Sequence, residues 1–250
     1  MKKLKLLSIA ALTLLLGGLS LTAQEQKVED NLQFTVSTGF ESEYVYRGEE
    51  LADNVATLGL EVQYKALYAG LIGISEVTSL EDFDGEVDLY IGAQFGDVLG
   101  ASLDVGVLTY TYPNATTSLG QTNYSIEPYV GIVFDDLLLT PSGYVYYDIQ
   151  REAITLEARL SETFTTENSL PLIGKISITP SAYFGYTDIN DFSPKGLNIE
   201  EAYQYAGVNL NVSFNLGPVL VSGGPRYSHT DDSSFDANEL YWGTNVALFF

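Results

Sequence analysis

The sequence of 250 residues contains no cysteine and only one histidine. Without cysteine there is no disulfide framework, no thiolate metal ligand and no cysteine nucleophile, and one histidine rules out a metal centre built from several imidazoles. Basic residues are also scarce, because 11 Lys and Arg stand against 33 Asp and Glu, for a formal charge of -22. We therefore predict a protein without a cofactor or metal that binds no nucleic acid, since phosphate backbones require a positive surface.

Long hydrophobic runs are missing except at the N-terminus. Lys2, Lys3 and Lys5 precede an apolar run over residues 6–16, and a small residue, Ala23, stands before Gln24. This order is typical of a secretory signal, and the run is shorter than the ~20 residues of a spanning helix. The sequence predicts a signal peptide over residues 1–23 and one domain over residues 24–250.

The domain itself is apolar and regular, with 46% hydrophobic and 12% aromatic residues. From Leu32 onward, apolar and polar residues alternate, which is the pattern of strands that send successive side chains to opposite faces. No segment has the spacing of an amphipathic helix. Twelve candidate strands can be counted: 32–47, 55–65, 67–75, 85–96, 99–112, 124–134, 137–149, 151–164, 175–186, 202–215, 218–229 and 239–250.

Alternation fits both a soluble β-sandwich with its apolar face inside and a transmembrane barrel with its apolar face in lipid. The connections favour the barrel because short and long ones alternate, as periplasmic turns and outer loops do. Two connections, at residue 150 and over 165–174, break this order. The short turns are 65–66, 96–98, 135–136 and 215–218, and the longer loops are 48–53, 76–84, 113–123, 187–201 and 230–238.

If the first strand is taken to run outward from the periplasm, the aromatic residues on the apolar face fall into two groups, one near each membrane surface. Aliphatic residues lie between the groups, and rings that prefer a lipid–water interface form such belts. The sequence therefore predicts an antiparallel barrel of about 12 strands in a bacterial outer membrane. The outer belt would hold Tyr44, Tyr46, Tyr124, Tyr186 and Trp242, and the periplasmic belt Phe34, Tyr64, Tyr68, Phe95, Phe134, Phe164, Phe214 and Phe250.

Several segments are similar to those of a known barrel family. Tyr44-Val45-Tyr46-Arg47-Gly48 resembles the Tyr-x-Phe-Arg-Gly segment of the TorF-family porins, and residues 86–92, 104–113 and 146–148 also have counterparts there. The resemblance spans the mature chain and implies an outer-membrane barrel with a channel role. The terminal Phe250 on an alternating strand resembles the signal read by the barrel assembly machinery, which we expect as a partner during biogenesis.

Charged residues on the polar face are the candidates for a pore lining. A lumen rich in carboxylates would admit small polar solutes and favour cations, whereas charges that pair across neighbouring strands would fill the barrel. Arg47 could bind a solute carboxylate or form a cross-strand ion pair, and we favour the pair. The candidates are Glu41, Glu43, Arg47, Glu61, Lys65, Glu86, Asp88, Asp104, Glu127, Glu157, Arg159, Lys175, Arg226 and Glu239.

An enzymatic reading finds little support. Ser228 and His229 are adjacent on a candidate strand, so their side chains point to opposite faces and would not act as nucleophile and base. No Gly-x-Ser-x-Gly elbow occurs in the sequence. We therefore expect no catalytic residues.

The function most consistent with this pattern is passive diffusion of small hydrophilic solutes across the outer membrane, with membrane lipid and lipopolysaccharide around the barrel. The main alternative is a non-conducting structural or adhesive barrel that binds a partner through its outer loops.

Overall fold

The computed structural model describes residues 32–77, 85–98, 100–113, 123–189 and 202–250. The predicted signal peptide over 1–23 and most of the predicted loops over 76–84, 113–123 and 187–201 lie outside the described residues. No helix among the described residues is long and apolar enough to cross a membrane.

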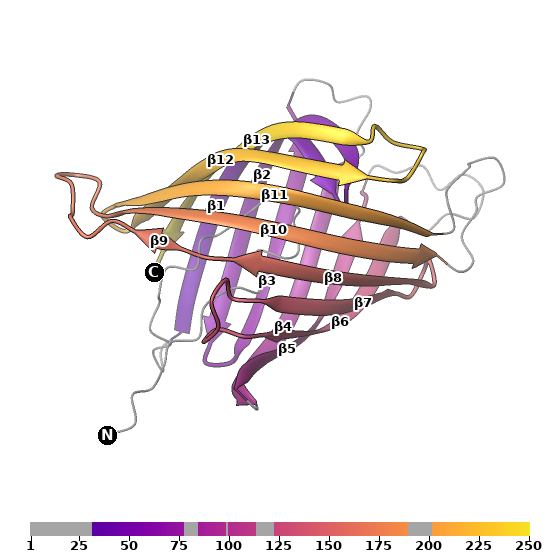
Figure 1. Ribbon diagram of the computed structural model, residues 1–250, viewed down its shortest axis with the longest axis horizontal. Coiled ribbons are helices and arrows are strands. Elements are labelled where there is room, and N and C mark those ends of the chain that lie inside the picture. Colours follow the sequence, from indigo (N-terminus) through magenta and orange to yellow (C-terminus); the bar gives the residue numbers. More distant parts are fainter. Residues whose placement is uncertain (1–31, 78–84, 99, 114–122, 190–201) are drawn as a thin grey trace.

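All elements of the described chain are strands, and they form one closed antiparallel barrel (Figure 1). Each barrel strand pairs with the next, while β1 pairs with β13 to close the sheet. The two-residue β9 pairs only with the start of β10, so twelve strands make the wall and the predicted architecture is confirmed. The strands are β1 (Leu32–Tyr46), β2 (Glu49–Tyr64), β3 (Leu67–Glu76), β4 (Glu86–Val98), β5 (Ala101–Thr111), β6 (Tyr124–Val133), β7 (Ser142–Asp148), β8 (Ala153–Ser161), β9 (Phe164–Thr165), β10 (Ile176–Ile189), β11 (Ala202–Leu216), β12 (Val219–Thr230) and β13 (Asn238–Phe249).

The wall is apolar outside and polar inside. On β11, Val208 and Leu210 are 53% and 42% exposed, whereas Asn209 and Asn211 between and beyond them are 7% and 5% exposed. The same alternation places leucine, isoleucine, valine and phenylalanine on the outer surface of the other barrel strands. This is the inverse of a soluble fold, and it is stable only where hydrocarbon surrounds the barrel.

The first predicted outer loop, over residues 48–53, is wrong. β1 and β2 are joined by a two-residue turn at Arg47 and Gly48, and both residues have positive φ, 51° and 87°. Such turns match the right-handed twist of paired strands, so the strands continue to the turn. The register shifts between Tyr44 and Val45, where Leu51 of β2 has no partner on β1, so a bulge lies on β2 close to this turn.

The predicted belts hold only in part. Tyr124 and Trp242 in one belt, and Phe34, Tyr64, Phe95, Phe164 and Phe250 in the other, are exposed on the outer surface. Tyr44, Tyr46 and Tyr68 were expected there and instead lie inside the barrel. Beyond Glu41, β1 no longer pairs with β13 and its end lies inside the barrel with Tyr44 and Tyr46. Tyr68 occupies the interior register of β3 with Ile72 and Ile74.

The predicted strand over 137–149 begins later, at Ser142. Leu139 and Thr140 have positive φ, 63° and 33°, and Pro141 follows them. Positive φ is unfavourable for residues with a Cβ and is incompatible with a strand, so the chain turns here. The Phe134 amide donates to the Pro141 carbonyl at 2.9 Å and closes the turn.

Candidate functional site

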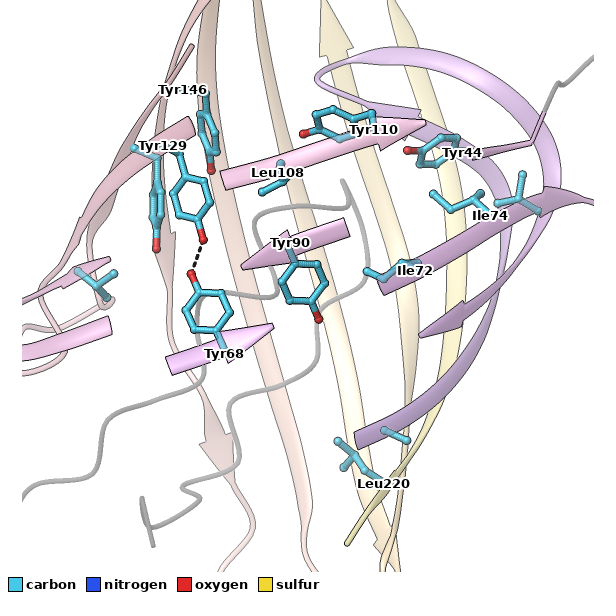
Figure 2. Packing of buried hydrophobic residues seen from close by; sticks show 14 residues of the cluster. Tyr44, Tyr68, Ile72, Ile74, Tyr90, Leu108, Tyr110, Tyr129, Tyr146 and Leu220 are labelled. Carbon is cyan, nitrogen blue, oxygen red and sulfur yellow. Dashed lines mark hydrogen bonds between the residues drawn. The ribbon is translucent and has the colours of Figure 1, made fainter. Parts of the chain in front are cut away.

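Tyrosine side chains dominate the barrel interior. Tyr68, Tyr90, Tyr129, Tyr144 and Tyr146 pack together on β3, β4, β6 and β7, with ring centroids 5.8–6.3 Å apart. Figure 2 shows Tyr68 and Tyr129 pointing toward one another, and their hydroxyl groups share a hydrogen bond. A smaller group of Tyr183, Tyr203 and Tyr205 lies inside β10 and β11.

Interior carboxylates are held by these tyrosine hydroxyls. Asp104 is fully buried and accepts hydrogen bonds from Tyr68 at 2.6 Å and from Tyr144 at 3.1 Å. In the same way Tyr90 donates to Glu61 and Tyr205 donates to Glu157, both at 2.9 Å. Buried carboxylates are costly unless hydrogen-bonded, so the phenols stabilise acids that have few basic neighbours.

Three arginines each form an ion pair with one interior carboxylate. Arg47 binds Glu127 with two parallel hydrogen bonds of 2.8 and 2.9 Å, the geometry that makes guanidinium–carboxylate pairs strong and directional. The Arg226 Nη1 atom lies 2.7 Å from Glu41 Oε1. The Arg159 Nη2 atom lies 3.5 Å from Oε1 of Glu157, which is on the same strand. Arg47 is paired, as expected, but its partner is far along the chain on β6 rather than on a neighbouring strand.

Glu86 and Asp88 form a third kind of site. They are two residues apart on the interior face of β4 and are 3% and 2% exposed. Their carboxyl groups are close enough to interact with each other. Among the described residues, no group of three or more histidine or acidic side chains is arranged to hold a metal ion.

The remaining candidates lie toward the ends of the barrel. Glu43 and Glu239 are partly buried and face each other near the β1–β2 turn. Lys65 is in the turn between β2 and β3, and Lys175 precedes β10, and both are exposed.

Six interior tyrosines share a pairing with glycine that was not predicted from the sequence. Each stands directly opposite a glycine on the neighbouring strand, and its ring occupies the space where the side chain of that residue would be. The signal is present in the sequence, but the strand register must be known before it can be used. The pairs are Tyr90 with Gly70, Tyr68 with Gly92, Tyr129 with Gly106, Tyr144 with Gly131, Tyr205 with Gly185 and Tyr183 with Gly207.

Ser228 and His229 lie on opposite faces of β12. The Ser228 hydroxyl is buried inside and accepts a hydrogen bond from Tyr183 at 3.1 Å. The His229 ring is on the outer surface, with Nδ1 3.2 Å from Asn238 Oδ1. The two side chains therefore do not form a nucleophile–base pair.

A closed antiparallel barrel with an apolar outer surface and a polar interior defines an outer-membrane β-barrel protein. The chain belongs to the Gcw_chp family, described as bacterial proteins of unknown function, whose model matches residues 25–195. No curated protein matches the chain in sequence.

Solved structures share the fold at low sequence identity. The NanC porin is similar with a TM-score of 0.53 and 10% identity, over 86% of this chain and 98% of that chain. LpxR from Salmonella typhimurium is similar with a TM-score of 0.52 and 9% identity, over 86% of this chain and all of that one. These likenesses establish the fold.

Proposed function

We propose that the protein is an outer-membrane channel for passive diffusion of small hydrophilic solutes, with a preference for cations. The observation that carries the proposal is the excess of acid over base inside the barrel. Glu61, Glu86, Asp88 and Asp104 are interior carboxyl groups beyond those that pair with the three arginines. Carboxylates that line a narrow passage attract cations and repel anions.

The other predicted lining residues belong to the same proposal. Glu41, Glu127 and Glu157 with their arginines would form a charged wall, and Glu43 and Glu239 would raise the local cation concentration at one mouth. The resemblance to the TorF-family porins supports a channel role. The bore must be small, because tyrosine rings fill much of the interior beside β3–β7.

The same proposal covers the parts of the chain outside the barrel wall. Residues 1–23 would direct export, and the terminal Phe250 would be read by the assembly machinery. The finished barrel would be surrounded by membrane lipid and lipopolysaccharide. The mechanism requires no catalytic step, in line with the separation of Ser228 from His229 across β12.

Planar-bilayer recording of the refolded protein tests the channel. We expect discrete conductance steps and a reversal potential of cationic sign in a salt gradient. A barrel that folds, as judged by heat-modifiable migration in gels, and yet conducts in no salt would be the non-conducting structural alternative.

Glu86→Gln combined with Asp88→Asn tests whether interior carboxylates set the ion selectivity of the channel. These substitutions keep the side-chain shape and remove two interior acids, so the reversal potential should move toward zero. Asp136→Asn, in the exposed turn between β6 and β7, is the matched control and should change it little. An equal effect of both variants would count against a selectivity set by the interior.

A further inference from the structure

The outer part of the β1–β2 hairpin leaves the barrel wall. β1 pairs with β13 only as far as Glu41, opposite Gly243, and β2 pairs with β3 only from Val55, opposite Glu76. Between these points, the paired residues of segment 42–54 pair with each other, and one further hydrogen bond, from the Val77 amide to the Asn54 carbonyl, joins the base of this segment to the end of β3. We call this segment the inner hairpin, because Tyr44 and Val45 are buried inside the barrel, at 4% and 2% exposed, and most of its other residues are partly buried.

One side of the hairpin tip is attached to β5, β6 and β7. Arg47 at the turn forms its bidentate pair with Glu127 on β6. The guanidinium lies 4.8 Å from the ring centroid of Tyr46 and 5.0 Å from that of Tyr146 on β7. The Tyr46 hydroxyl is 2.9 Å from the hydroxyl of Tyr110 on β5. In Figure 2 the ribbon that bears Tyr44 bends over toward the strand that bears Tyr110.

The other side of the tip touches the opposite wall. Gly48 is buried, and a Cβ placed on it would lie 2.6 Å from the Cβ of Tyr205 on β11 and 3.0 Å from that of Thr230 at the end of β12. The tip therefore contacts β5–β7 and β11–β12 at once, while its base emerges between β13 and β3. A segment with these contacts crosses the interior.

From this geometry we propose that the inner hairpin is the gate of the channel and that the Arg47–Glu127 pair is its latch. The inference rests on the proposed channel function. In the closed position the hairpin obstructs the passage, and release of the latch lets residues 42–54 swing away from Glu127 and Thr230.

The charges around the hairpin suit a reversible closure. Glu43 and Glu50 on the hairpin lie close enough to Glu239 on β13 for their carboxyl groups to interact. Repulsion between these carboxylates opposes the closed position, whereas Arg47 provides a strong, directional attachment at the tip. At its base the hairpin keeps one backbone hydrogen bond, from the Val77 amide to the Asn54 carbonyl at 2.8 Å, but beyond this point the backbone ladder that fixes the other strands does not continue. Closure therefore depends on a few contacts that substitution can remove.

The latch is tested by Arg47→Ala, with Lys175→Ala as the control. Lys175 carries the same charge, is exposed and precedes β10. Loss of a hydrogen-bonded charge pair should raise the ratio of open to closed time by about tenfold or more. Lys175→Ala should leave this ratio within about twofold of the parent.

A reversible cross-link tests the gate itself. The chain has no cysteine, and Arg47→Cys with Glu127→Cys would put one thiol on each side of the latch, whose charged groups lie 2.8 Å apart. The removed side chains leave room for a short dithiol, which on oxidation joins the two cysteines through two reducible disulfides. The oxidised double variant should be closed, and the same molecules after reduction should open at least about tenfold more often. The two single cysteine variants, treated in the same way, control for the substitutions, and gel mobility confirms both folding and bond formation.

The outcomes separate the two proposals. Equal conductance of the oxidised and reduced double variant, with the bond shown to be formed, would overturn the gate and leave the channel standing. Absence of conductance in the parent, in Arg47→Ala and in the reduced double variant, all folded, would overturn the channel function and the gate with it. Closure on oxidation and opening on reduction would support both.

Discussion

At the scale of single residues, the barrel interior is built from complementary pairs of large and small side chains. The Tyr205 ring lies over Gly185 on the neighbouring strand, and the Tyr144 ring lies over Gly131 in the same manner. A tyrosine brings both a large ring that fills space and a hydroxyl that hydrogen-bonds when buried. The glycines thus let the rings lie flat along the wall and reach the acids.

This pairing predicts the effect of a single methyl group. Gly185→Ala would place its Cβ within the Tyr205 ring and should lower the free energy of unfolding by about 1–3 kcal/mol, as overpacking does. Gly73→Ala on β3 is the control, because nothing lies within 4 Å of the added atom, and its effect should stay within about 0.5 kcal/mol. Urea unfolding in lipid vesicles measures both, and equal values would refute the packing argument.

At the scale of elements, regular strands were predictable and irregular ones were not. β11 alternates along its whole length because each face meets a single environment. β1 alternates only as far as its pairing with β13, which ends at Glu41, because beyond it the strand leaves the wall and Tyr44 and Val45 are both buried. The turn at Leu139–Thr140 interrupted an apolar run that composition alone would continue as a strand.

The faces of β11 can be checked by single cysteines, one at a time, in the cysteine-free chain. Val208, Leu210 and Val212 point outward and Asn209, Asn211 and Ser213 point inward. A lipid-soluble maleimide should label cysteines at the first three positions several-fold faster than at the second three. Labelling that does not alternate, in variants that fold as shown by gel mobility, would mean that the register of this strand is wrong.

At the scale of the whole molecule, charge and hydrophobicity are separated by the wall. The chain carries a formal charge of -22, and many of its acids lie inside the barrel or near its mouths, while the outer surface of the wall is apolar. A field from many carboxylates acts over a distance set by the ionic strength.

Cation preference should therefore decrease with salt. Raising the electrolyte from about 0.1 M to about 1 M shortens the Debye length from about 10 Å to about 3 Å, so the permeability ratio for cations over anions should fall. Reversal potentials at a fixed concentration gradient measure it. A ratio independent of salt would indicate that the charges at the mouths contribute nothing and that any selectivity arises from direct contacts inside.

The order of residues alone determined the class of fold, because a period of two, an apolar face and short turns are local properties of each strand. It also placed Glu86, Asp88, Asp104 and Glu127 on the polar face, because alternate residues of a strand point to opposite faces. Only the closed barrel decided which of these groups meet. The pairing of Arg47 with Glu127, and the position of residues 42–54 inside the barrel, depend on contacts between segments about 80 residues apart, which no local pattern encodes.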